Sequence, residues 1–182
     1  MNVLRQSLER LLVRVNYFLW QRRRHNCLVL ETVAEHDLLI LPEVMNPHIF
    51  RSGETFAAVL DQDLVPAQSH VLDVGTGSGV VALAAAHHAE RVVAVDINPA
   101  AVRCARINAL LNNLEKRIEV REGDLFEAVQ GEKFDVVLFN PPYFRGTPQP
   151  GFDQAWRSED VVERFAAGLD AHLKTGGSAL LI

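Results

Sequence analysis

The sequence predicts an α/β fold in which a doubly wound, mostly parallel sheet carries helices on both faces. From His70 onward, short apolar runs alternate with longer helical stretches, and the first junction between them is rich in glycine. Strands that alternate with helices form βαβ units, whose crossovers are right-handed. The predicted strands are residues 71–74, 91–96, 117–121, 134–139 and 178–182, and the predicted helices are residues 79–89, 99–112 and 158–173.

An N-terminal extension is predicted over residues 1–50, ahead of a main domain at residues 51–182. Spacings of three and four between apolar residues indicate a helix with one apolar face, and paired apolar runs around a polar turn indicate a hairpin. The expected elements are a helix over 3–20, hairpin strands over 27–32 and 38–41, a loop bracketed by Pro42 and Pro47, and a helix over 55–60. We expect this extension to take part in substrate recognition.

The composition is that of an ordinary globular protein. Of the 182 residues, 48% are hydrophobic and 23% are charged, which excludes a disordered or fibrous chain. The net charge of −5 is unevenly distributed, because residues 1–25 contain six arginines and one glutamate. Such a segment can bind phosphate or anionic lipid, and it can equally be the solvated face of a helix.

The two cysteines, Cys27 and Cys104, form no CxxC pair, so the sequence predicts neither a disulfide framework nor a metal site. Arginines interrupt the apolar residues at the N-terminus, and no run approaches the ~18 apolar residues of a membrane span. We therefore expect a soluble, cytoplasmic protein.

A glycine-rich turn, from Gly75 to Gly79, follows the first predicted strand of the sheet. Glycine permits positive φ and lets a ligand approach the backbone closely, while the start of the next helix offers unpaired N–H groups. Such a turn also occurs for purely structural reasons. The acid at the end of the next strand, Asp96, makes it more specific, because a carboxylate there can accept hydrogen bonds from both hydroxyls of a ribose.

Asp96 is also a candidate cap for the next helix, but Asn98 followed by Pro99 suits that role better and would leave Asp96 free. The loop and the acid together predict a nucleoside-bearing cofactor. The glycine spacing disfavours NAD, and the strand acid Asp73 would repel a pyrophosphate while suiting the amino group of a sulfonium amino acid.

At these residues the chain resembles the class I methyltransferases, which bind S-adenosylmethionine on a Rossmann-like sheet, and the resemblance covers about residues 50–182. It implies that Asp73 and the glycine loop line the methionine and ribose, that Ile97 covers the adenine, and that Asp124 reads its amino group. Thr55 matches an upstream motif that closes over the methionine carboxylate. The implied cofactor-binding residues are Thr55, Asp73, Gly75, Thr76, Gly77, Gly79, Asp96, Ile97, Asp124, Leu125 and Asn140.

The segment Asn140-Pro141-Pro142-Tyr143 follows the fourth predicted strand, at the carboxyl end of the sheet where ligands of open α/β folds bind. Prolines alone would make a stiff turn. The Asn140 side-chain oxygen and the Pro141 carbonyl can accept hydrogen bonds from a target NH₂, while Tyr143 and Phe144 can stack on a planar substrate. This arrangement suits methylation of a conjugated nitrogen, with catalytic Asn140, Pro141 and Tyr143, and with substrate contacts from these residues and Pro142 and Phe144.

The motif resembles that of amino-methyltransferases, which include release-factor glutamine and adenine-N6 enzymes. The acceptor therefore stays open between a protein glutamine, as in a translation factor, and an exocyclic amine of a nucleic acid. The family normally continues beyond the strand expected at residues 178–182 through another helix and an antiparallel strand pair. We therefore expect a truncated domain, and a non-catalytic binding or scaffold protein is the alternative.

Overall fold

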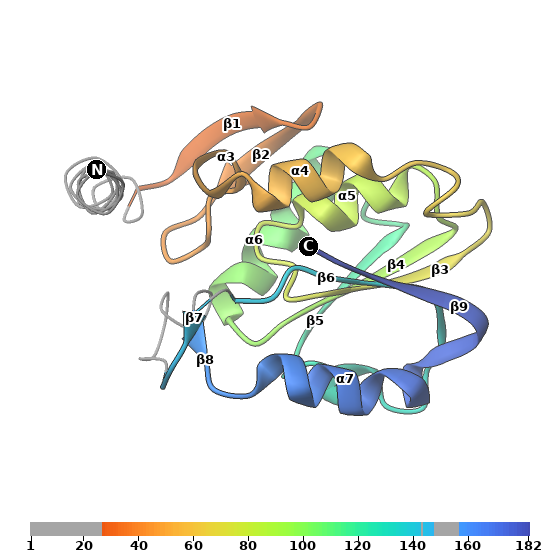
Figure 1. Cartoon of the computed structure of the whole chain (residues 1–182). Helices are drawn as coiled ribbons and strands as arrows, with labels where there is room; N and C mark the ends of the chain where they lie inside the picture. Colours follow the sequence, from red (N-terminus) through yellow and green to blue (C-terminus); the bar gives the residue numbers. More distant parts are fainter. Residues whose placement is uncertain (1–26, 143, 148–156) are drawn as a thin grey trace, which may run out of the picture.

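The computed structural model describes residues 27–142, 144–147 and 157–182, and its centre is a five-stranded sheet (Figure 1). The strand order is β5-β4-β3-β6-β9, and all neighbouring strands are parallel. The bounds are His70–Val74 for β3, Arg91–Asp96 for β4, Ile118–Glu122 for β5, Phe134–Phe139 for β6 and Leu173–Leu181 for β9. The chain order reverses between β3 and β6, so a topological switch point lies there. The predicted α/β fold class is confirmed.

Helices cover both faces of this sheet (Figure 1). One face carries α4, α5 and α6, and the other carries α7. The bounds are Ser52–Val59 for α4, Val80–Ala86 for α5, Pro99–Leu111 for α6 and Val161–His172 for α7. Side chains alternate across the strands of the sheet and fill two hydrophobic clusters, one on each face. Burial on both faces explains why the strands are near-continuous apolar runs.

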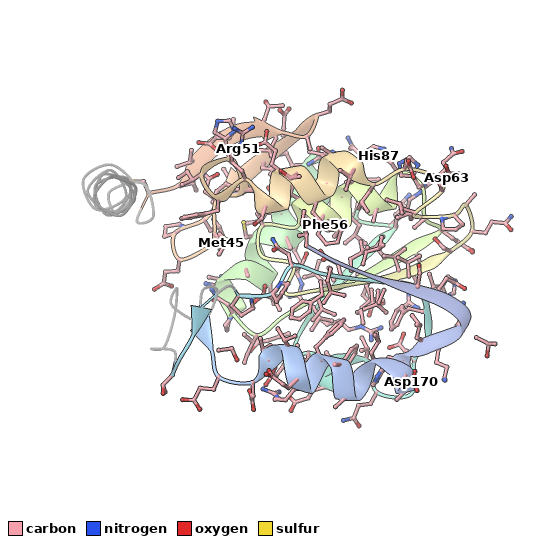
Figure 2. The ribbon with its side chains drawn as sticks, in the orientation of Figure 1. Met45, Arg51, Phe56, Asp63, His87 and Asp170 are labelled. Carbon is pink, nitrogen blue, oxygen red and sulfur yellow. The ribbon has the colours of Figure 1, made fainter. Side chains whose placement is uncertain are left out.

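The N-terminal hairpin consists of β1 (Val29–Val33) and β2 (His36–Ile40), which pair antiparallel as the sequence predicted. Its inward side chains Val33, Leu38 and Ile40 join the same hydrophobic cluster as α5 and α6. The hairpin therefore shares its core with the main sheet. Figure 2 shows Phe56 on the sheet-facing side of α4, where its ring is buried in this cluster, and Arg51 at the outer start of that helix.

Several predicted boundaries differ from the structure, and two of the differences have a visible local cause. A short helix, α3 (Pro47–Phe50), replaces part of the predicted loop, because the Asn46 side chain accepts from His48 N and Pro47 occupies the first helical position. The helix α4 begins at Ser52 instead of residue 55. The helix α7 begins at residue 161 instead of 158, since Ser158 Oγ accepts from the amide of Val161 at its start.

Residues 174–177, between the predicted helix over 158–173 and the predicted strand over 178–182, form an irregularity within the last strand. Strand β9 starts at Leu173, opposite Phe134, and regular pairing resumes with Ser178 opposite Val136. The extra residues on β9 bulge out, and Gly176 supplies the required left-handed conformation with φ of 80°. A glycine pair here bends the strand without ending it.

The remaining described elements are a 3-10 turn at Glu127–Val129 and the short parallel strands β7 (Phe144–Arg145) and β8 (Arg157–Ser158). The predicted helix over 3–20 and the motif residue Tyr143 lie outside the described residues. Within the described part of the chain, no helix has the length and apolar character needed to cross a membrane.

Candidate functional site

A cavity of about 250 Å³ opens at the carboxyl ends of β3, β4, β5 and β6. Its walls come from the loops that follow these strands, from residues 43–53 before the sheet, and from the first turns of α7. This is the switch point of the sheet, where the crevice between diverging loops receives ligands in open α/β folds. The position of the cavity agrees with the prediction that the loops after these strands form the site.

The glycine loop forms the floor of this cavity and adopts left-handed conformations at Gly75, Gly77 and Gly79, with φ of 67°, 57° and 87°. The amides of Gly75 and Thr76 donate to Val95 O at 2.8 and 3.0 Å, which ties the loop to β4. A side chain at Gly77 would meet nothing within 4 Å, so the backbone there is open to a ligand.

Gly79 has a different role from Gly77. It does not line the cavity, and a Cβ at this position would lie 3.2 Å from Ala105 Cα and Cβ in α6. The absence of a side chain therefore lets the start of α5 pack closely against α6. The loop thus combines one position open to a ligand with one position that closes a helix contact.

Asp73 is a buried carboxylate in the last part of β3 and lines the cavity. Burial raises the pKa of Asp73 to about 7, against the hydrogen bond donated by Thr76 Oγ1 at 2.6 Å, which lowers it. The nearby Asp96 charge raises the pKa further. A cation bound beside Asp73 would stabilise its ionised form.

Asp96 lies at the end of β4 and holds the glycine loop in place. Its Oδ2 accepts from Gly77 N at 2.8 Å and its Oδ1 accepts from Asn98 N at 2.9 Å. Burial raises the pKa of Asp96, while these backbone amides lower it. Asp96 is free of the helix-capping role, as the sequence predicted, but it is engaged in holding the glycine loop. A carboxylate has about four acceptor positions, so a ligand hydroxyl can still donate to it.

The prediction that Asn98 caps the next helix is confirmed. Asn98 Oδ1 accepts from Ala100 N at 2.9 Å, and Pro99 is the first residue of α6. The Asn98 amide also donates through Nδ2 to Glu43 O at 3.0 Å. Asn98 therefore caps the helix and fastens the segment before α3 over the cavity.

Three further predicted residues, Ile97, Asp124 and Leu125, also line the cavity. The Ile97 side chain is 47% exposed, so it offers an apolar surface to a ligand. Asp124 Oδ2 accepts from Arg164 Nη2 at 2.5 Å, and this ion pair joins the loop after β5 to α7. Arg164 was missed in the sequence, because nothing in its neighbourhood pairs it with an acid forty residues earlier.

Asn140 and Pro142 line the cavity directly after β6. Asn140 Nδ2 donates to Ser52 Oγ at 3.1 Å. Pro141 lies between them without lining the cavity, Phe144 begins β7, and Tyr143 is outside the described residues. The structure thus brings Asn140 to the same cavity as Asp73, Gly77 and Asp96.

Thr55 is not brought to this cavity. Its side chain is exposed on α4, and the wall on that side is formed instead by residues before it, including Met45, Pro47, Phe50 and Gly53. Figure 2 shows Met45 in the segment that leads into α3. The sequence indicated a loop here and no contact with a ligand.

A family model described as the methyltransferase small domain matches residues 48–182. The chain belongs to this family. The matched region contains the whole five-stranded sheet and all residues of the cavity except Glu43, Val44, Met45 and Pro47. The predicted resemblance to methyltransferases is therefore confirmed.

Curated relatives are methyltransferases by name. A protein of Methanocaldococcus jannaschii with the provisional name protein N5-glutamine methyltransferase is 37% identical over 142 residues, which cover 73% of this chain and 71% of the relative. The release factor glutamine methyltransferase of Moorella thermoacetica is 35% identical over 152 residues, which cover 80% of this chain and 53% of the relative. The chain thus spans about half the length of this second relative.

Solved methyltransferase structures share the fold. A 16S rRNA N2 methyltransferase of T. thermophilus, in complex with AdoMet and guanosine, aligns with a TM-score of 0.65 at 23% identity. The alignment covers 85% of this chain and 41% of the solved one. At this identity the likeness establishes the Rossmann-like methyltransferase fold.

The residues around the cavity fit the S-adenosylmethionine that this family implies. Asp73 provides a buried carboxylate for an ammonium group, and Asp96 provides acceptors for hydroxyls at a strand end. Gly77 leaves the backbone accessible beside them. Among the described residues, no group of His, Cys, Asp or Glu side chains is arranged to hold a metal ion.

Proposed function

We propose that this protein transfers a methyl group from S-adenosylmethionine to the side-chain nitrogen of a glutamine in a protein. The observation that carries the proposal is the placement of Asn140 in the wall of the cavity built by Asp73, Gly77 and Asp96. An amide side chain next to a cofactor cavity suits an acceptor that is itself an amide. Relatives named for glutamine methylation support this choice of acceptor.

In this proposal the chain's own residues bind the cofactor and orient the acceptor. Asp73 attracts the ammonium group, Asp96 accepts from the ribose hydroxyls, and Ile97 covers the adenine, with Asp124 and Leu125 beside it. S-adenosylmethionine, when bound, supplies an electrophilic methyl group. Gly75, Thr76 and Gly77 line the cavity with their backbone and would contact the bound cofactor.

The acceptor nitrogen needs positioning, because its lone pair is delocalised into the neighbouring carbonyl. We assign this to Asn140 Oδ1 and the Pro141 carbonyl, which accept hydrogen bonds from the target NH₂, while Pro142, Tyr143 and Phe144 form the rest of the acceptor site. Fixing the nitrogen in the attack geometry removes an entropic part of the barrier. No general base is assigned, since the nitrogen becomes acidic only after methylation and can release its proton to water.

The acceptor in this proposal is a translation factor, and the cytoplasm is the corresponding location, because the curated relatives include release factor methyltransferases. Residues 1–50 are assigned a part in acceptor recognition, since residues 43–50 contribute to the wall of the cavity. Thr55 keeps its predicted role only if α4 rearranges when the cofactor binds, because its side chain is exposed here.

Transfer of labelled methyl groups tests the acceptor class. The full chain is incubated with methyl-labelled S-adenosylmethionine and a purified, unmethylated bacterial release factor, and in parallel with bulk RNA. We expect label in the protein that is lost on proteolysis and retained on nuclease treatment, with a methylated glutamine in the digested peptide. Label only in RNA would move the proposal to a base amine, and cofactor binding without transfer to either would favour the non-catalytic alternative.

The pKa of Asp73 predicts a pH-dependent affinity for the cofactor. Because an ionised carboxylate attracts the ammonium group, S-adenosylmethionine should bind about tenfold more weakly at about pH 6 than at about pH 8, as Asp73 is protonated below about 7. Isothermal titration calorimetry across this range measures the change. The Asp73→Asn variant, which keeps the shape without the charge, should bind weakly at both pH values. A flat profile in the parent protein would contradict the role of Asp73.

A further inference from the structure

Ser52 connects α4 to the acceptor side of the cavity. It is the first residue of α4, and its Oγ accepts from Asn140 Nδ2 at 3.1 Å across 88 positions of the sequence. We propose that Ser52 is a positioning residue that fixes the orientation of the Asn140 amide. This inference rests on the proposed function, because it assigns Asn140 to the acceptor nitrogen.

The orientation matters because the two arms of an amide are chemically opposite. The oxygen accepts hydrogen bonds and the NH₂ group donates them, so only the oxygen can bind a target NH₂. In the structure the Asn140 NH₂ arm faces Ser52 Oγ, and the planar group therefore directs Oδ1 away from Ser52. If the amide were reversed, its NH₂ group would face the NH₂ group of the target glutamine. The target nitrogen would then lose its hydrogen bond to Asn140.

Ser52 can hold Asn140 in place because the first turn of α4 is itself tightly fixed. The next residue, Gly53, is buried, and a Cβ on it would lie 3.4 Å from both Pro47 Cβ in α3 and Val80 Cγ1 in α5. The Thr55 amide donates to Arg51 O at 2.7 Å within the same turn. The start of α4 is thus wedged between α3 and the helix that follows the glycine loop.

This arrangement connects the two sides of the cavity. The cofactor side belongs to the glycine loop and α5, and the acceptor side belongs to the loop after β6. Ser52 connects the two sides, because the adjacent Gly53 packs against α5 while the Ser52 hydroxyl accepts a hydrogen bond from Asn140. Loss of the hydroxyl should therefore slow transfer without weakening cofactor binding, because Ser52 itself is not among the residues that line the cavity.

The test compares Ser52→Ala and Ser52→Thr with the parent chain, using methyl-labelled S-adenosylmethionine and a purified, unmethylated bacterial release factor. Ser52→Ala should lower kcat by roughly 10- to 100-fold, since a small misplacement of a positioned group costs rate steeply. The dissociation constant for S-adenosylmethionine should stay within about twofold of the parent value, as expected for an interaction with the acceptor side alone. Ser52→Thr keeps the hydroxyl and should recover most of kcat.

Ser69→Ala is the matched control. Ser69 lies just before β3 at the opposite end of the sheet, and its buried hydroxyl has no hydrogen-bond partner among the described residues. This variant should keep the parent kcat. Parental kcat in Ser52→Ala, equal losses in the Ala and Thr variants, or a matching loss of cofactor affinity would each overturn the inference.

A readout without turnover separates this inference from the proposed function. In ¹⁵N-labelled protein, the side-chain NH₂ signals of Asn140 should shift and exchange faster with water in Ser52→Ala, and return in Ser52→Thr. Unchanged signals overturn the inference whatever the activity. By contrast, parental transfer by Asn140→Ala would overturn the proposed role of Asn140 in the reaction, even if the NMR signals shift as expected.

Discussion

Replacing Asn140 by alanine should abolish most methyl transfer and leave cofactor binding nearly intact. The side chain lies in the cavity wall directly after β6, and its oxygen is assigned to the acceptor NH₂. Without it the nitrogen loses a hydrogen bond that holds it in the attack geometry. Removing one such preorganised group from an active site costs roughly 100- to 1,000-fold in kcat. Single-turnover transfer to the release factor, with an excess of enzyme, measures this loss directly.

Cofactor affinity decides how this result is interpreted. Asp73, Asp96 and the glycine loop are unchanged in Asn140→Ala, so calorimetry should give a dissociation constant for S-adenosylmethionine within about threefold of the parent value. Gln130→Ala is the matched control, since it removes an exposed amide near the opposite end of β6 and should change neither quantity. A joint loss of transfer and cofactor affinity would show that Asn140 serves the cofactor and not the acceptor.

The sheet could be predicted from the sequence because its signals are local. Strands buried on both faces are continuous apolar runs, and four of the five predicted strands agree with the structure to within one residue at each end. The glycine loop, Asp96 and Asn140 could be placed together at the carboxyl end of the sheet, because parallel strands all end on the same side. The fifth strand was cut short, because Gly176 and Gly177 signal a backbone irregularity without indicating whether the chain turns or bulges.

The contacts across the cavity could not be predicted, because each joins distant parts of the chain. The Ser52–Asn140 and Arg164–Asp124 pairs span 88 and 40 positions, and neither residue type indicates its partner. Thr55 does not reach the cavity for a geometric reason. Residues two apart on a helix face nearly opposite sides. Gly53 faces α3 and α5, so Thr55 faces solvent.

Loss of the Asn108 side chain should destabilise the fold. Asn108 is fully buried in α6, where Oδ1 accepts from Leu39 N at 2.7 Å and Nδ2 donates to Leu39 O and Ser78 O at 3.1 and 2.8 Å. The Asn108 side chain therefore provides hydrogen-bond partners for backbone groups of both β2 and the glycine loop. Alanine would leave the partly buried Leu39 amide and the buried Ser78 carbonyl without these partners, at about 1 to 3 kcal/mol for a buried group and less for a partly buried one.

We expect Asn108→Ala to lower the free energy of unfolding by roughly 3 kcal/mol, measured by urea unfolding and far-UV circular dichroism. Asn112→Ala is the matched control on the same helix. Asn112 Nδ2 donates to Asp37 O at 2.9 Å, where water can replace the lost bond, and to Asn108 O at 2.8 Å, which keeps the Asn112 backbone amide as a donor. The cost should therefore stay below about 1 kcal/mol. Equal losses in the two variants would contradict this account. A larger loss in Asn108→Ala, with weaker S-adenosylmethionine binding, would indicate that the hairpin stabilises the glycine loop through this one side chain.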